Sequence, residues 1–487
     1  MHMLTPWAAV LAAALLVQEG VAAGADRIVS GAPPLVLDGD RWSVSRAGGV
    51  GESQPPLPAR VPGDILTDLQ RAGRLPDPYF NVSWRRPDFV DCWNTGLWTY
   101  TRTFSTPNAG TAQHLLVFDG IRMGAVVSLN GHWLFNASNS FLRYSLPLTA
   151  GNFKQDGSAN VLNVTFGAEL GIDCGGRFTL SSQIDWAPRM TTNDSFTGRS
   201  TFGFGIWRSV YLVPVPDAAI TQLVVHTYYA GDHPTVPLSK TMHAGFRVVV
   251  RAEVFSAAAA VAKLTVAGDW AHAVPVVALV NMQAGHNNVT VELLPEQTRN
   301  VQLWDPVGYG VQHRYRITGT LVPGRTGAPN VTATRKIGFR HLVLVTINDT
   351  DSEAAASAAN ADGTGQFTMF FRCNGAAIYS RGANKIPMEL MEGRMSGDAH
   401  RRLVQSAAEG RMNTLRVWGG AIWEPESFYD AADEYGILIY HDAQFLIGGL
   451  EPYGIAGPGV RGTASERDEL EYQIKRLSVR LTAASIP

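Results

Sequence analysis

The sequence predicts a multidomain protein in which two all-β domains precede a domain that alternates strands and helices. Its 487 residues are too many for one hydrophobic core, and about three domains are expected for this length. Between residues 27 and 345, short apolar or alternating runs recur with the spacing of β-strands. After residue 367 the pattern changes, and apolar strands are separated by segments with helical periodicity.

Residues 1–25 have the features of a secretory signal peptide. The apolar run over 4–17 is too short to span a bilayer, and small residues follow it at 22–25. No Lys or Arg precedes the run, and a short membrane anchor is the alternative interpretation. Seven Asn-X-Ser/Thr sequons agree with export, at Asn81, Asn136, Asn163, Asn193, Asn288, Asn330 and Asn348.

The composition narrows the possible partners. The 40 Lys and Arg residues nearly balance the 42 Asp and Glu residues, which speaks against a nucleic-acid or anionic-membrane surface. With three cysteines, at most one disulfide forms; Cys92 and Cys174 share a predicted domain and are the expected pair, with Cys373 left over. No Cys/His spacing is typical of a metal site, so we expect no metal or other cofactor.

The first β domain is expected over residues 27–215. Its candidate strands are 98–104, 115–118, 125–129, 161–166 and 210–213. The dipeptide Asn130-Gly131 follows one of them and predicts a tight hairpin turn. Strands of this length and spacing are typical of a sandwich or jelly roll.

The second β domain is expected over residues 216–345, with candidate strands at 246–254, 276–280 and 315–320. Its size, about 125 residues, fits an immunoglobulin-like β-sandwich. Residues 346–366 contain few large apolar side chains and are interpreted as a linker or surface insertion.

The third domain is expected over residues 367–487. Helical spacing over 399–411 precedes a short strand at 414–417, and a second helix over 428–435 precedes an apolar strand at 437–440. This alternation predicts parallel βαβ units, and strands that are apolar throughout suit a sheet buried on both faces. We expect the first part of a (β/α)8 barrel.

In such a barrel, chemistry is found at the carboxyl ends of the strands. Trp418, His441 and Asp442 follow directly on two of the predicted strands. The alternative is structural: Trp418 plugs the barrel mouth and Asp442 caps a helix. The sequence leaves this choice open.

Several short runs occur along the chain in an order that is similar to one enzyme family. They are Val61–Asp64, Trp98–Phe104, Phe141–Tyr144, Gly205–Arg208, Lys336–Arg340, Gly382–Asn384 and Arg416–Gly420. In this order they resemble the β-mannosidases of glycoside hydrolase family two. The resemblance implies a jelly roll that binds sugar, an immunoglobulin-like sandwich and a TIM barrel.

The resemblance also implies an activity. These enzymes hydrolyse terminal non-reducing β-D-mannose residues of oligosaccharides and glycoprotein glycans with retention, which requires two carboxyls roughly 5–5.5 Å apart. Both are glutamates in this family, and neither matches a position here; we expect both beyond Pro487. The expectation is therefore a lysosomal or secreted β-mannosidase, truncated at its carboxyl end and inactive alone. A non-catalytic carbohydrate-binding paralogue and another exo-glycosidase of the family are the alternatives.

The resemblance assigns residues that bind the β-mannoside substrate. A loop of the family's jelly roll is matched at Asp185 and Trp186, although Ile184 and Ala187 replace its Trp and Gly. A carboxylate can accept hydroxyl hydrogen bonds, and an indole face can pack on a sugar. The alternative for Asp185 is a loop carboxylate bonded to its own backbone.

The remaining assigned residues lie in the predicted barrel. Trp418 matches a tryptophan that lines the mannose pocket, Arg416 matches an arginine near the nucleophile, and Asn384 is a further candidate. A buried ion pair is the alternative for Arg416, and turn capping is the alternative for Asn384. The oligomeric state is left open by the sequence.

Overall fold

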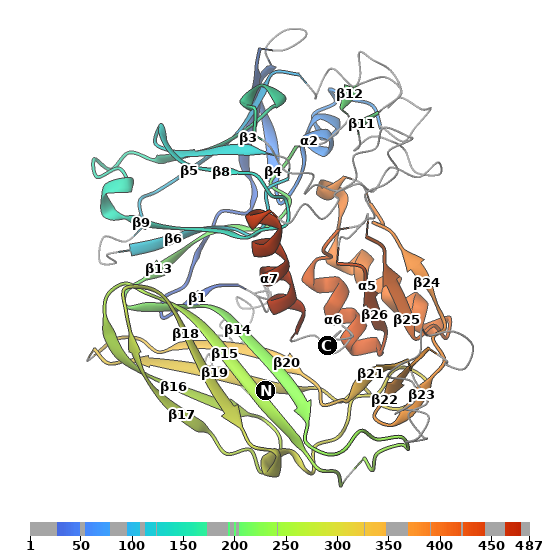
Figure 1. The fold of residues 1–487 in the computed structure, drawn as a ribbon. Coiled ribbons are helices and arrows are strands. Elements are labelled where there is room, and N and C mark those ends of the chain that lie inside the picture. Colours follow the sequence, from blue (N-terminus) through green and yellow to red (C-terminus); the bar gives the residue numbers. More distant parts are fainter. Residues whose placement is uncertain are drawn as a thin grey trace, which may run out of the picture.

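In the computed structural model, three domains surround one central helix (Figure 1). The structure describes residues 27–48, 54–77, 95–107, 113–122, 124–172, 193–194, 199–200, 204–240, 242–325, 327–346, 369–389, 391–419, 422–443 and 463–478. The expected signal peptide, the Cys92–Cys174 pair and nearly all of the expected linker lie outside these ranges. Within them, no helix combines the length and the apolar character needed to cross a membrane.

The first domain is a β-sandwich with jelly-roll architecture, as predicted. A six-stranded sheet in the order β4-β3-β5-β10-β7-β8 faces a four-stranded sheet in the order β2-β13-β6-β9. The strands are β2 (Leu35–Val36), β3 (Gly39–Ala47), β4 (Gln54–Val61), β5 (Leu97–Phe104), β6 (Gln113–Phe118), β7 (Ala125–Leu129), β8 (His132–Ala137), β9 (Tyr144–Thr149), β10 (Asn160–Phe166) and β13 (Val210–Val215). Alternating side chains of β5 and β10 point into the core, as the period of two requires.

Local signals in this domain act as the sequence predicts. Asn130 and Gly131 have φ angles of 54° and 82° and join β7 to β8, which confirms the hairpin turn. The short helix α2 (Ile65–Arg71) begins at Asp64, whose carboxylate accepts the Thr67 amide at 2.9 Å. The two-residue strands β11 (Asn193–Asp194) and β12 (Arg199–Ser200) form a separate ribbon.

The second domain is an immunoglobulin-like sandwich of two four-stranded sheets, β1-β14-β15-β18 and β17-β16-β19-β20. Its strands are β1 (Val29–Ser30), β14 (Ala218–Tyr229), β15 (Phe246–Ser256), β16 (Ala260–Gly268), β17 (Val276–Met282), β18 (Gly285–Leu293), β19 (Tyr315–Pro323) and β20 (Val331–Ile337). Val29 and Ser30, which the expected boundaries place in the jelly roll, pair with Ile220 and Ala219 of β14. The beginning of the described chain therefore ties the two sandwiches together.

A small antiparallel sheet follows the second sandwich. It contains β21 (Leu342–Val345), β22 (Phe370–Cys373) and β23 (Ala376–Ile378). Because β21 pairs with β22, the expected boundary at 345 cuts through this sheet instead of preceding it. Cys373 lies here as a buried free thiol, and burial raises its pKa to about 12.

The third domain contains three parallel strands and two helices that join them; both helices and the last two strands were predicted, whereas the first strand was not located from the sequence. The strands are β24 (Gly382–Lys385), β25 (Thr414–Val417) and β26 (Leu438–His441); the helices are α5 (Gly397–Glu409) and α6 (Glu426–Tyr435). Gly436 ends α6 with a φ of 76°, a left-handed conformation that glycine adopts without strain. The described residues thus form two successive βαβ units.

The central helix α7 (Ala464–Ser478) was assigned no element from the sequence. Its buried face is largely polar, with Glu466, Glu469, Gln473 and Arg476, so it lacks the apolar stripe by which amphipathic helices are recognised. Figure 1 shows it in red between the jelly roll, the second sandwich and α6. Contacts with all three domains, described below, explain why polar side chains are buried there.

Candidate functional site

The carboxyl ends of the three parallel strands place the barrel candidates side by side. In the register of the sheet, Asn384 of β24 pairs with Arg416 of β25, and Arg416 pairs with Tyr440 of β26. Asp442 follows β26 directly. The alignment explains how residues far apart in sequence meet at one edge, because parallel strands end together.

Arg416 and Asp442 form a two-pronged ion pair. Nε of Arg416 donates to Oδ1 of Asp442 at 3.0 Å, and Nη2 donates to Oδ2 at 2.6 Å. The amide of Gly419 donates to the same Oδ2 at 3.0 Å. Arg416 therefore forms an ion pair, the alternative that the sequence left open for it. The pair is not fully buried, since 39% of the Arg416 side chain is exposed.

Asn384 is exposed and joins this cluster. Its Oδ1 accepts a hydrogen bond from Nη1 of Arg416 at 3.3 Å. Because the oxygen faces the guanidinium, the amide NH2 is the end of the side chain left to donate to another molecule. Trp418 follows β25 and is half-buried at the same edge, with its backbone N–H donating to the Lys385 carbonyl at 3.2 Å. The structure thus brings together Asn384, Arg416 and Trp418.

The two jelly-roll candidates, Asp185 and Trp186, lie outside the described residues. Their proximity to the strand ends stays a prediction.

Beneath the strand ends is a buried charged group that the sequence analysis missed. Glu424 is fully buried and forms an ion pair with Lys385, the last residue of β24. Nε2 of His400 in α5 lies 3.6 Å from the second oxygen of Glu424. Burial lowers the pKa of His400, so the Lys385 ammonium is the principal counter-charge. The only sequence signal for this pair is a lysine at the end of a short strand, and such a lysine does not indicate which carboxylate it pairs with.

His441 lies between aromatic rings at the end of β26. Its ring stacks on Trp423 with a centroid distance of 4.5 Å, and Nε2 lies 3.2 Å from the Tyr429 hydroxyl. Desolvation, together with the positive charges of Arg476 and Lys385, lowers the pKa of His441 to about 3. The imidazole is therefore neutral near pH 7 and acts in packing and hydrogen bonding.

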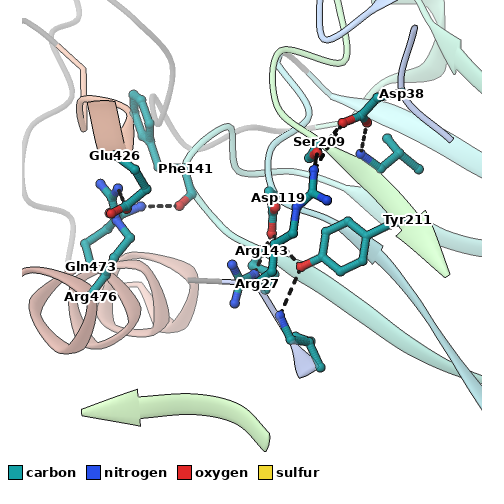
Figure 2. A network of polar contacts seen from close by, with 12 residues as sticks. Arg27, Asp38, Asp119, Phe141, Arg143, Ser209, Tyr211, Glu426, Gln473 and Arg476 are labelled. Atoms are coloured by element: carbon teal, nitrogen blue, oxygen red, sulfur yellow. Dashed lines mark hydrogen bonds and ion pairs between the residues drawn. The ribbon is translucent and has the colours of Figure 1, made fainter. Parts of the chain in front are cut away.

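Helix α7 supports this layer and connects it to the sandwiches (Figure 2). Nε1 of Trp423 donates to Glu469 at 2.8 Å, and Arg476 pairs with Glu426 of α6 at 2.6 Å. On the jelly-roll side, Gln473 donates to the Phe141 carbonyl at 2.6 Å. On the side of the second sandwich, Nζ of Lys475 donates to Glu253 of β15 at 2.6 Å. The sequence could not reveal these contacts, because the partners lie in separate domains.

The arrangement is suited to binding rather than to acid–base chemistry. Of the described carboxylates near the strand ends, Asp442 is held by Arg416 and Gly419, and Glu424 is buried against Lys385. Retaining hydrolysis requires two accessible carboxyls that face one bond. Exposed amide and guanidinium donors beside an indole instead suit a polyhydroxylated ligand.

Comparison with protein families gives a match to the first domain. Residues 42–174, most of the jelly roll, match the family described as glycosyl hydrolase 2 galactose-binding domain-like. The match covers the sandwich and stops before the parallel strands. It therefore supports the assignment of the first domain as a jelly roll of this kind.

Curated relatives extend over more of the chain. The β-mannosidase of Rattus norvegicus is 28% identical over 473 residues, which cover 90% of this chain and 47% of the relative. β-Mannosidase B of Emericella nidulans is 28% identical over 445 residues, which cover 86% of this chain and 46% of the relative. The chain spans about half the length of the curated relatives that it matches.

Solved structures share the fold. The β-D-mannosidase of Dictyoglomus thermophilum aligns with a TM-score of 0.69 at 21% identity, covering 93% of this chain and 52% of that one. An exo-chitosanase of Amycolatopsis orientalis aligns with a TM-score of 0.68 at 19% identity, covering 93% and 49%. By sequence, the chain is thus similar to curated β-mannosidases and, over its jelly roll, to the glycosyl hydrolase 2 galactose-binding domain-like family, and the solved structures share its fold.

Proposed function

We propose that this chain carries sugar-binding residues of a retaining exo-β-mannosidase, acting on terminal non-reducing β-D-mannose of oligosaccharides and glycoprotein glycans. The observation that carries the proposal is the hydrogen-bonded group Asn384–Arg416–Asp442 beside Trp418, at the carboxyl ends of the parallel strands. The names of the curated relatives support mannose as the sugar.

Each side chain has a distinct part in this proposal. The Asn384 amide donates to a sugar hydroxyl, because its oxygen already accepts from Arg416. The Gly419 amide donates to Asp442, whose carboxylate fixes the guanidinium of Arg416. Arg416 in turn donates to Asn384 and holds its side chain. Trp418 packs its indole face on the C–H surface of the ring. Asp185 accepts hydrogen bonds from further hydroxyls, and Trp186 packs its indole face on the sugar.

The catalytic step needs two glutamates, and neither position of the family pattern is matched in this sequence. We therefore expect no turnover from the 487-residue chain alone. A non-catalytic carbohydrate-binding protein would behave in the same way in an activity assay. Binding must for this reason be measured separately from hydrolysis.

Calorimetric titration of the full chain with β-1,4-mannobiose tests the sugar-binding part. We expect mannobiose to bind at least tenfold more tightly than cellobiose, and Trp418→Ala or Asn384→Ala to weaken mannobiose at least tenfold. Trp133→Ala is the matched control, because this tryptophan is 65% exposed on the jelly roll. Absent mannobiose binding, or equal binding of cellobiose, would overturn the proposal.

Hydrolysis of 4-nitrophenyl β-mannoside tests the catalytic part. The expected rate equals that of buffer, since loss of a catalytic unit costs many orders of magnitude. Purified chain that turns over the substrate, with a rate reduced by Trp418→Ala, would show that other residues serve as the acid and nucleophile. It would leave the mannoside assignment intact.

We also propose that the protein enters the secretory pathway and is lysosomal or secreted. Three sequon asparagines are exposed, Asn136, Asn288 and Asn330, whereas Asn163 is half-buried and accepts from the Thr101 hydroxyl at 2.9 Å. Glycopeptide mapping after expression in a eukaryotic secretory host should show glycans at the three exposed sites and little at Asn163. An unmodified product that retains residues 1–25 would contradict the proposal.

A further inference from the structure

The jelly roll has a hollow that shares no residue with the strand-end site. Its volume is about 800 Å³, and residues from both sheets line it, with walls from β2, β3, β5, β6 and β13. The resemblance to glycosidases assigns no role to this part of the domain. Its lining combines basic side chains with apolar ones.

The charged lining is of one sign. Arg41, Arg102 and His114 line the hollow, and no Asp or Glu is among the described residues that line it. Nη1 of Arg102 donates to the Arg41 carbonyl at 3.0 Å, a neutral acceptor. Arg41 is exposed, whereas Arg102 is only 8% exposed. Two guanidinium groups therefore share one partly enclosed space.

Two buried nitrogen atoms in this lining lack partners in the described part of the chain. They are Nε of Arg102 and Nδ1 of His114, a residue that is 3% exposed. Buried polar groups in folded proteins are normally hydrogen-bonded, and an unpaired guanidinium N–H is a costly exception. Both residues line the hollow, so the two unpaired nitrogens lie close to it.

The electrostatics agree with an anionic occupant. Burial, and then the nearby charge of Arg41, lower the pKa of Arg102, so the charged guanidinium is disfavoured in the empty hollow. Burial also lowers the pKa of His114, which leaves this imidazole neutral near pH 7. An anion beside Arg102 would reverse the unfavourable contribution from Arg41.

The rest of the lining is largely apolar. Pro33, Leu35, Phe104, Leu212 and Pro214 form much of the wall. Such a wall offers nothing to a bare inorganic ion, which keeps its hydration, but it buries the hydrocarbon part of an organic molecule favourably. The two halves of the lining thus specify one kind of ligand.

We propose that this hollow binds a small organic carboxylate. The carboxylate accepts hydrogen bonds from Arg102 and Arg41, whose planar donor groups match its geometry, and the apolar body packs on the proline and leucine wall. The site is independent of the proposed mannoside site, since the two share no side chain.

The test is calorimetric titration of the full chain with benzoate and with benzyl alcohol, which has a similar shape and no charge. We expect benzoate to bind at least tenfold more tightly. Arg102→Gln and Arg41→Gln should each weaken benzoate at least fivefold and leave benzyl alcohol unchanged. Arg41 is exposed, so its replacement tests the site even if Arg102→Gln fails to fold.

Arg247→Gln is the control, because it removes an exposed arginine from the second sandwich. Its benzoate affinity should equal that of the unaltered protein. Equal binding of benzoate and benzyl alcohol, no binding of either, or benzoate affinity that survives Arg41→Gln would overturn the proposal. Inorganic phosphate that binds as tightly as benzoate would overturn the organic part of it.

Discussion

The second sandwich and the parallel sheet bury their interiors in different ways. The sandwich core is built from aliphatic and aromatic side chains, such as Val250, Leu264 and Ile317, nearly all from its own strands. The core of the parallel sheet includes Phe141 and Trp207 of the jelly roll together with Leu477 of α7. One domain therefore supplies its own core, and the other completes its core with side chains from its neighbours.

The two regions also differ in buried charge. Lys385 and Glu424 are paired beneath the carboxyl ends of the parallel strands, and Glu469 and Arg476 of α7 are buried beside them. Such groups are tolerated only when they are paired and hydrogen-bonded. The stability of the parallel sheet therefore depends on specific polar partners, whereas that of the sandwich depends on buried apolar area. Substitutions of the two kinds should destabilise the two regions separately.

Glu424→Gln should have the largest effect. It leaves the Lys385 ammonium buried without its counter-charge, and breaking such a pair costs about 3–5 kcal/mol. Hydrogen exchange should show much faster opening of β24–β26 and unchanged protection of the second sandwich. The double substitution Lys385→Met with Glu424→Leu is the control and should recover much of the loss. A change below about 1 kcal/mol would refute the dependence on this pair.

Leu264→Ala should have a slightly smaller effect in the opposite region. The residue is fully buried in the second sandwich, and a leucine truncated to alanine in a core costs about 3 kcal/mol through lost burial and a cavity. Urea denaturation followed by hydrogen exchange should show loss in β15–β19, with protection of β24–β26 retained. Leu279→Ala, at a 79% exposed position of the same sandwich, is the matched control and should change little.

The pH dependence of the unfolding free energy should show a smaller difference, which comes from His441 at the parallel sheet. The pKa of His441 is about 3 in the folded protein, against an ordinary value of 6.5. Between these values the unfolded chain binds a proton that the folded chain does not, so stability falls as pH decreases from about 6.5 toward 3, by at most about 1.4 kcal/mol per unit. His441→Phe, which keeps an aromatic ring, should reduce this slope in urea denaturation. Equal slopes for both proteins would contradict the expectation.

Arg247→Gln should have the smallest effect. Arg247 pairs with Glu292 at 3.1 Å on the surface of the sandwich, with about half of each side chain exposed. Exposed pairs contribute about 0.2–1 kcal/mol, and salt screens them. The difference in unfolding free energy from the unaltered protein should shrink further at high salt. A loss comparable to that of Glu424→Gln would mean that exposure does not explain the contrast.

Much of the fold could be predicted because its signals are local. The strand over 98–104 follows from alternation along one segment, and the turn at Asn130-Gly131 follows from two residues with positive φ. The helix α6 and its end at Gly436 are likewise set by neighbouring residues. Of the candidate site, the sequence placed Trp418, His441 and Asp442 at strand ends and Arg416 within a strand. The strand that carries Asn384 was not predicted, and the parallel register brings it beside Arg416.

The sequence by itself determined many of the strands and the helices α5 and α6, because periodicity and turn chemistry act over a few residues; α7 was not among them. Only the tertiary structure decided which polar groups are paired. Asn139 donates to Glu469 at 2.9 Å, although the two residues are 330 positions apart. The buried face of α7 is polar because residues of other domains hydrogen-bond to it. Likewise, the sequence alone does not decide whether Arg416 binds a ligand or a neighbouring side chain. Its pairing with Asp442 follows from the alignment of two parallel strands, and pairing of this kind depends on distances in space that no local pattern records.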